Sequence, residues 1–167
     1  LRKRKNRIRK PLTVIMKDIE EVHKYCFVNE KEKKLLTGHK KPIVILKKKN
    51  NQLPNNISFN SDSLGITLPQ THLHSLLFDD EIKILAMTNG NLDNMPIIYK
   101  DEEALSKLNE VADYFLIHDK EIYKPVKDLV VKVILNEERI IRFGRGYNSV
   151  ILNNREDNFN KKDLYEH

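Results

Sequence analysis

The chain has 167 residues, of which 40% are hydrophobic and 32% are charged, and its formal net charge is +6. This length predicts one domain with a core of its own. No window approaches the roughly 18 consecutive apolar residues of a membrane-spanning helix, so we expect no membrane span and a soluble, cytoplasmic protein. The positive charge favours an anionic partner, whether a nucleotide, a nucleic acid or an acidic protein face.

Thiol and metal chemistry are limited by the residue types present. A single cysteine, Cys26, cannot form an internal disulfide or a multi-cysteine zinc site, and its hydrophobic spacing indicates a buried helical thiol. His72 and His74 are expected at the start of a helix, where positions i and i+2 point apart, so we predict no metal site there. His118 is interpreted as a packed or hydrogen-bonded histidine at the end of a strand rather than a general base.

The first part of the chain predicts strands that alternate with helices. Residues 11–16 (PLTVIM) predict a short buried strand, because they are apolar and rich in β-branched side chains. Asp18 is the expected N-cap of the helix that follows. Asn29 is the expected N-cap of a second helix, which should end at Gly38 in the left-handed conformation. Residues 42–46 (PIVIL) predict the next buried strand.

The middle of the chain predicts a loop, two strands and a helix. Residues 50–63 are rich in Asn and Ser and show no period, which is typical of a loop. A strand is expected at 64–68, followed by a helix over 71–78. Residues 83–88 (KILAMT) predict a further strand, which runs directly into the turn 89–91 (NGN).

The last part of the domain predicts one clear helix and a hairpin. Apolar residues at helical spacing predict a helix over 101–112, with Asp101 as its N-cap. Residues 114–118 (YFLIH) predict a short strand. Residues 129–135 and 139–143 predict a hairpin with a two-residue acidic turn.

The order of these elements predicts an α/β fold, with a twisted mixed sheet and flanking helices. We assign residues 1–150 to this single domain. Residues 151–167 lose all periodicity and predict a flexible polar tail.

Three segments carry side chains suited to anion binding. The first is a basic run whose cations are Arg2, Lys3, Arg4, Lys5, Arg7, Arg9 and Lys10. Taken alone, this run is typical of a solvated arm or of a nucleic-acid or localisation patch. It leads directly into a predicted buried strand, however, and a guanidinium held by a sheet can grip a phosphate bidentately.

The other two segments follow predicted strands. Thr88, Asn89 and Asn91 place hydroxyl and amide groups at the carboxyl end of a strand, where open α/β sheets usually bind ligands. An ordinary Asn-Gly turn is the alternative. Arg142 and Arg145 alternate with glycines after the hairpin, where they could line an anion site or simply end the hairpin.

These segments, in this order, resemble the YrdC-like domain of HypF carbamoyltransferases over residues 1–149. The motifs that carry the resemblance are RKRKNRIRKPLTVIM, LLTGHKKPIVIL, LGITLPQTHLHSLLF, AMTNGNLDNMPI, ALSKLNEVADYFLIHDKEI and RFGRGY. Each motif alone is weak evidence, but six in the right order are hard to obtain by chance. The resemblance implies a YrdC-like fold.

The resemblance also implies a reaction. HypF proteins mature nickel–iron hydrogenases by making the carbamoyl precursor of the cyanide ligands. Their YrdC-like domain, which is similar to threonylcarbamoyl-adenylate synthases, joins a carbamate unit to ATP and releases pyrophosphate. The implied cofactors are ATP and Mg²⁺, and the implied partners are a carbamoyl donor and other hydrogenase maturation proteins.

Site residues follow from the same resemblance. Lys5 and Arg7 match a Lys-x-Arg pair that grips the phosphates and the acyl intermediate, so they are the implied catalytic residues. The implied nucleotide-binding set is Lys5, Arg7, Thr88, Asn89, Asn91, Arg142 and Arg145.

The sequence departs from the family pattern at several positions. Asn89 replaces a serine, and in the segment YKPVKDLVV, Pro125, Lys127 and Leu129 replace an arginine, an aspartate and a serine. A lost cation or hydroxyl at a nucleotide site could each cost about 1–3 kcal/mol. The chain is also expected to begin partway through the usual domain, which would expose a sheet edge and favour a homodimer. The alternatives are therefore a nucleic-acid-binding YrdC-like module and a catalytically inactive interaction domain.

Overall fold

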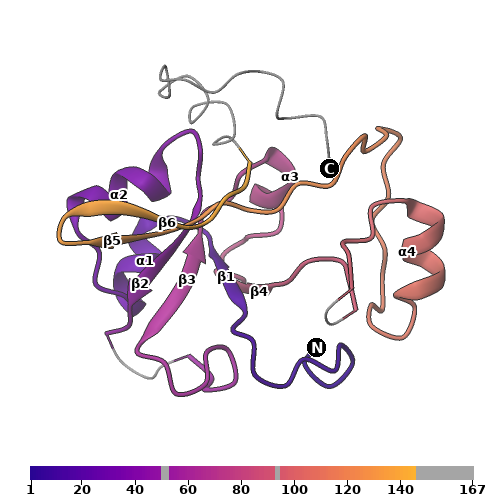
Figure 1. Ribbon diagram of the computed structural model, residues 1–167, viewed down its shortest axis with the longest axis horizontal. Coiled ribbons are helices and arrows are strands. Elements are labelled where there is room, and N and C mark those ends of the chain that lie inside the picture. Colours follow the sequence, from indigo (N-terminus) through magenta and orange to yellow (C-terminus); the bar gives the residue numbers. More distant parts are fainter. Residues whose placement is uncertain (50–52, 93–94, 146–167) are drawn as a thin grey trace, which may run out of the picture.

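The computed structural model describes residues 1–49, 53–92 and 95–145 (Figure 1). A six-stranded mixed sheet with the order β4-β1-β3-β2-β5-β6 forms its centre. The strands are β1 Thr13–Met16, β2 Ile43–Lys47, β3 Ser63–Thr67, β4 Ile84–Met87, β5 Val130–Ile134 and β6 Glu137–Arg142. The pairs β1/β3 and β2/β5 are parallel, and the other pairs are antiparallel. The predicted α/β fold with a twisted mixed sheet is thus confirmed.

Two helices follow β1, and both begin where the sequence predicts. In α1 (Ile19–Tyr25), the Asp18 carboxylate accepts the Glu21 backbone N–H at 2.7 Å. In α2 (Glu30–Thr37), Asn29 and Glu32 each accept the other's backbone N–H, which forms a capping box. Both helices contact the sheet, α1 at β1 and α2 at β2.

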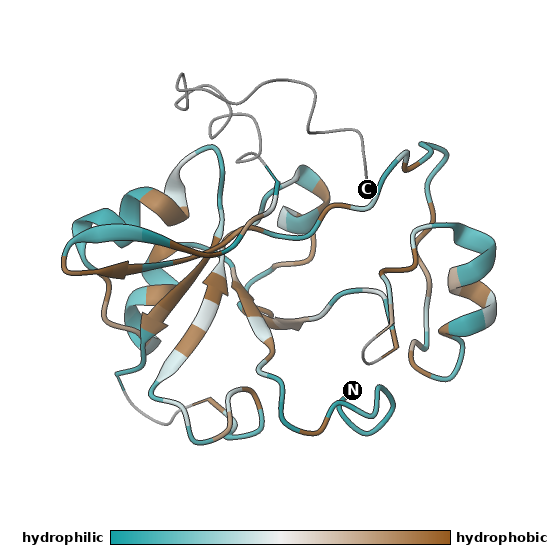
Figure 2. Ribbon diagram, in the orientation of Figure 1, coloured by the Kyte–Doolittle hydropathy of each residue, from teal (hydrophilic) through white to brown (hydrophobic). Residues whose placement is uncertain are grey.

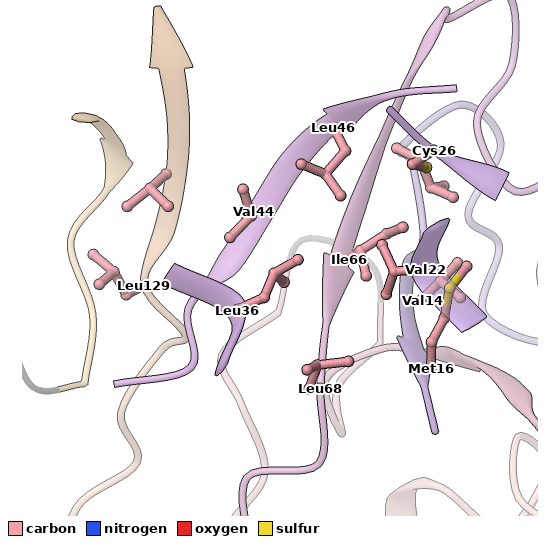
Figure 3. Packing of buried hydrophobic residues seen from close by; sticks show 12 residues of the cluster. Val14, Met16, Val22, Cys26, Leu36, Val44, Leu46, Ile66, Leu68 and Leu129 are labelled. Atoms are coloured by element: carbon pink, nitrogen blue, oxygen red, sulfur yellow. The ribbon is translucent and has the colours of Figure 1, made fainter. Parts of the chain in front are cut away.

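The core lies between these two helices and the sheet (Figure 3). Val22, Cys26 and Leu36 come from the helical segments, and all three are fully buried. They belong to one cluster with the strand residues Val14, Met16, Val44, Leu46, Leu64, Ile66 and Val131, together with Leu68 and Leu129. Figure 2 shows the same pattern as apolar strands flanked by helices with polar outer faces. The buried thiol predicted for Cys26 is confirmed, although this residue ends α1 and pairs with Lys48 in an isolated bridge.

The remaining helices are shorter than the sequence predicts. The helix predicted over 71–78 is a single turn, α3 (His72–Ser75), capped by Thr71. The helix α4 (Asp101–Lys107) has Lys100 at its N-cap position, so Asp101 is its first residue rather than its cap. No residue within α4 is buried, and Leu108, which is buried, already stands at the C-cap, so the helix does not extend to residue 112.

Three further predictions were wrong. Residues 114–118 form no strand, because they lie beyond α4 and away from the sheet (Figure 1), and Tyr114 is 92% exposed. Gly38 ends α2 with φ −71°, which is not left-handed. The hairpin turn consists of Leu135 and Asn136 rather than acidic residues, because β6 already begins at Glu137.

The sheet order places β4 and β6 at the two edges. Dimerisation through an exposed edge stays a prediction. The predicted tail, residues 151–167, lies outside the described residues. No helix in the described part of the chain is long and apolar enough to cross a membrane.

Candidate functional site

Lys5 is a buried lysine that ties the N-terminal basic run to the loop after β4. Only 3% of this residue is exposed. Its Nζ donates to Thr88 Oγ1 at 2.9 Å, to the Asn89 carbonyl at 2.6 Å and to Asn91 Oδ1 at 3.2 Å. Three acceptors match the three N–H donors of an ammonium group. The structure therefore brings together two segments that are more than eighty positions apart in the chain.

Arg7 lies beside Lys5 and meets the same threonine. Its guanidinium donates to Thr88 Oγ1 at 3.3 Å, to the Lys10 carbonyl at 3.2 Å and to the Pro11 carbonyl at 2.5 Å. These contacts fix the side chain at the entrance to β1. Thr88 thus accepts from both cations of the predicted Lys-x-Arg pair.

Arg2 holds the basic run in its folded shape. Its guanidinium donates to the carbonyls of Asn56, Ile57, Arg7 and Lys10, and it lies 4.7 Å from the centre of the Phe59 ring. The Arg4 guanidinium forms a salt bridge with the Asp113 carboxylate at 2.7 Å. The basic run is therefore a folded part of the domain and not a solvated arm.

A pocket of about 280 Å³ opens beside Arg7. It is bounded by Thr13 at the start of β1, by Thr67 at the end of β3 and by the segment 87–90 at the end of β4. Five of the predicted site residues line it, namely Arg7, Thr88, Asn89, Arg142 and Arg145. Three arginines from both ends of the domain thus converge on one small cavity, which gives it a positive potential.

The other two predicted residues, Lys5 and Asn91, are not among the residues that line the pocket. The Asn91 amide is used within its own loop, since Oδ1 accepts from Lys5 and Nδ2 donates to the Met95 carbonyl at 2.7 Å. In this structure both residues shape the loop that presents Thr88 and Asn89. Direct nucleotide contacts from Lys5 and Asn91 stay predictions.

The C-terminal arginines are placed by the segment that departs from the family pattern. Arg142 Nε donates to the Asp128 carbonyl at 3.1 Å, and the Arg145 guanidinium lies 3.5 Å from the Asp128 carboxylate. Between them, a Cβ on Gly144 would stand 2.2 Å from the Leu129 nitrogen and 2.4 Å from the Lys127 oxygen. Only glycine allows the backbone to pass this close.

Leu129 lies in the hydrophobic core, whereas neighbouring residues of the same segment line the pocket. Its side chain is 2% exposed and belongs to the hydrophobic core cluster, whereas Val126 and Asp128 line the pocket. The resemblance predicts a serine at this position. The buried leucine cannot supply a hydroxyl group to a ligand.

Sequence reasoning missed five polar residues that line the pocket: Thr13, Thr67, Gln70, His74 and Asp128. Gln70 Nε2 donates to the Lys41 carbonyl at 2.9 Å, and Thr67 is buried beneath it. The signal was the position of PQTHLH at the carboxyl end of a predicted strand, which we interpreted only as a helix start.

Among the described residues, no group of three or more His, Cys, Asp or Glu side chains is placed to hold a metal ion. His118 is exposed and lies in no strand, and its Nδ1 accepts the Lys120 backbone N–H at 3.2 Å. The predicted hydrogen-bonded role of His118 is confirmed, but its predicted position at the end of a strand is wrong.

Comparison with known proteins identifies the family. The family profile described as "Telomere recombination", which covers Sua5, YciO and YrdC proteins, matches residues 1–144. The chain belongs to the Sua5/YciO/YrdC family.

Within this family, the relatives with high similarity are HypF proteins. A probable carbamoyltransferase HypF from Methanocaldococcus jannaschii is 38% identical over 88% of this chain and 19% of its own length. Carbamoyltransferase HypF from Synechocystis is 37% identical, also over 88% of this chain and 19% of its own length. The chain thus spans about a fifth of the length of these curated relatives.

Solved structures agree with the sequence comparison. A full-length HypF in the phosphate- and nucleotide-bound form superposes with a TM-score of 0.85 and 43% identity, over 89% of this chain and 24% of that one. HypF from T. kodakarensis gives a TM-score of 0.84 and 34% identity, over 88% of this chain and 20% of that one. Sua5 from P. abyssi, at 16% identity and a TM-score of 0.67, shares the fold over 86% of this chain and 43% of its own. The YrdC-like fold of HypF proteins is therefore shown for this chain.

Proposed function

We propose that the chain binds ATP in the pocket beside Arg7 and joins a carbamate unit to it, as a HypF-like domain in the maturation of [NiFe] hydrogenases in the cytoplasm. In this reaction a carbamate oxygen attacks the α-phosphorus of ATP. The bond from that phosphorus to the bridging oxygen breaks, which yields carbamoyl-adenylate and pyrophosphate. Other hydrogenase maturation proteins would receive the carbamoyl group. The observation that carries the proposal is the convergence of Arg7, Arg142 and Arg145 on one pocket.

The electrostatics of the pocket suit this reaction. Negative charge develops on the leaving pyrophosphate, and cations that are already in position stabilise it without reorganisation. Arg7 is fixed by the Pro11 and Lys10 carbonyls, and Arg145 by Asp128. The buried ammonium of Lys5 adds positive charge directly behind Thr88.

Magnesium fits this site as a companion of the nucleotide rather than as a resident ion. Asp128 is the single carboxylate among the described residues that line the pocket. Mg²⁺ commonly binds through one or two carboxylates together with substrate phosphates and water. When bound, the ion would neutralise phosphate charge, with Asp128 as the protein group able to hold it.

The first test is isothermal titration of ATP with Mg²⁺ into the parent chain and into the double variant Lys5→Ala/Arg7→Ala. We expect saturable binding by the parent chain and at least a tenfold loss in the variant, since each lost charged contact contributes about 1.5–3 kcal/mol. The matched control is Lys3→Ala/Arg9→Ala, which removes one lysine and one arginine from exposed positions of the same run. Absence of binding by the parent chain at millimolar ATP would overturn the proposal.

Because Lys5 is buried, the double variant could weaken the fold as well as the site. Arg7→Ala alone, with a thermal melt of each protein, separates the two effects. Pyrophosphate release that requires both ATP and a source of carbamate, such as ammonium carbamate, then tests the reaction itself.

A second candidate function is a nucleotide-binding interaction domain without catalysis. The observation that favours it is the buried Leu129, which replaces the serine of the family pattern. Intact ATP binding without pyrophosphate release, in the presence of the carbamoyl donor, would select this alternative. A nucleic-acid-binding module stays a prediction, and it requires RNA or DNA affinity that falls steeply with salt.

A further inference from the structure

His74 is a titratable pocket residue to which the proposed reaction gives no role. It stands in the single turn of α3, it lines the pocket, and it is half-buried. Its neighbour His72, two residues earlier on the same turn, is exposed and does not line the pocket. The two histidines therefore offer a comparison within one helical turn.

The ring of His74 has a defined orientation. Its Nδ1 accepts the backbone N–H of Gln70 at 3.4 Å, and its own backbone N–H donates to Thr71 Oγ1 at 3.2 Å. Gln70 is in turn fixed, because its side-chain amide donates to the Lys41 carbonyl. The same amide donates to Thr67 Oγ1 at 3.5 Å, so the end of β3, Gln70 and His74 form one connected set of hydrogen bonds.

This orientation also decides which ring nitrogen carries the proton. A neutral imidazole has one donor and one acceptor nitrogen, and the hydrogen bond made by one nitrogen fixes the other. Because Nδ1 of His74 accepts the Gln70 N–H, the proton belongs on Nε2. Nε2 is therefore the donor nitrogen of a residue that lines the same pocket as Arg7, Arg142 and Arg145.

We propose that His74 is a ligand-binding residue which donates its Nε2–H to a phosphate oxygen of the nucleotide bound beside the three arginines. The proposal rests on the proposed nucleotide function and adds a contact to it. This hydrogen bond would orient the phosphate chain, while the arginines supply the charge. The histidine is thus a specificity-determining group for the phosphate end of the ligand.

Two substitutions of His74 separate this role from a purely structural one. Glutamine places an amide N–H near the position of Nε2, whereas asparagine places an amide oxygen near the position of Nδ1. His74→Gln keeps the donor toward the pocket and loses the acceptor for Gln70. His74→Asn keeps that acceptor and loses the donor.

The experiment is calorimetric titration of ATP with Mg²⁺ into the parent chain, His74→Gln and His74→Asn, with His72→Asn as the control. We expect about tenfold weaker binding for His74→Asn, since a hydrogen bond to a charged group is lost. His74→Gln should bind within a few-fold of the parent chain, and His72→Asn should not differ from it. A thermal melt of each variant shows that the fold is intact.

A structural role predicts the reverse order, with His74→Gln the weaker variant. That order, or equal binding by His74→Asn and the parent chain, would overturn the inference while the proposed function stands. No ATP binding by the parent chain would instead overturn the proposed function and the inference with it. As a second measurement, nitrogen NMR of the His74 ring in the neutral form should show the proton on Nε2, and a proton on Nδ1 would contradict the proposal.

Discussion

Cys26 shows how burial changes the chemistry of a single residue. The thiol is fully buried in the core, and this burial raises its pKa from the ordinary 9.0 to about 11, although Lys48 and Lys49 act in the opposite direction. A thiolate is the reactive form of cysteine, so this side chain should be inert in the folded protein.

The raised pKa of Cys26 predicts a defined dependence of stability on pH. The folded state holds the thiol proton more tightly than the unfolded state, so the contribution is fully present below pH 9 and is lost as pH rises toward 11. Urea unfolding at pH 8 and pH 10.5 should show a larger loss of unfolding free energy for the parent chain than for Cys26→Ala. The difference between the two proteins isolates the thiol from lysines and tyrosines that also titrate there. Equal losses would contradict the prediction.

The hairpin of β5 and β6 shows a conflict between sequence and structure within one element. Leu135 and Asn136 form its turn with φ of 50° and 59°, the left-handed values of a type I′ turn. Asparagine tolerates this conformation, but leucine is rare in it. Leu135 is also 94% exposed, so its side chain gains no burial in return.

Replacement of Leu135 should therefore stabilise the protein. We expect Leu135→Asn to raise the free energy of unfolding by about 0.5–1 kcal/mol, because the strained leucine is removed without loss of packing. Asn136→Leu serves as the reverse control and should lower that free energy. Chemical denaturation of the three proteins measures the effect, and a destabilised Leu135→Asn variant would refute this account of the turn.

At the scale of the whole molecule, the pocket depends on contacts between distant parts of the chain. Its lining residues come from the entrance to β1, the loop after β4 and the segment 126–145. Arg2 does not line the pocket, yet it fastens the basic run to the carbonyls of Asn56 and Ile57 and to that of Arg7. The position of Arg7 therefore depends on a residue outside the site.

Arg2→Ala should weaken ATP binding without removing any pocket residue. We expect a severalfold loss of affinity for ATP, because Arg2 would no longer hold in place the basic run that carries Arg7. Lys3→Ala is the matched control, since it removes the same charge from an exposed neighbour. If calorimetry gives the same loss for both variants, net charge rather than positioning explains the effect.

Local signals in the sequence were enough to predict the starts of the first two helices and the buried strands. Asp18 and Asn29 are N-caps because their side chains satisfy free backbone N–H groups, and this depends only on neighbouring residues. The apolar runs of β1, β2 and β5 identify buried strands for the same local reason. The motif order was sufficient to assign the family.

The tertiary structure decided what depends on contact between distant segments. The apolar run 114–118 has strand-like residues, yet it lies beyond α4 and away from the sheet (Figure 1), and it forms no strand. Lys5 is buried because three acceptors of the loop after β4 surround its ammonium group, which no neighbouring residue could indicate. His74 lines the pocket, and its ring is tied through Gln70 to Thr67 at the end of β3. Sequence patterns record local propensity, whereas burial and the direction of a side chain are set by the rest of the fold.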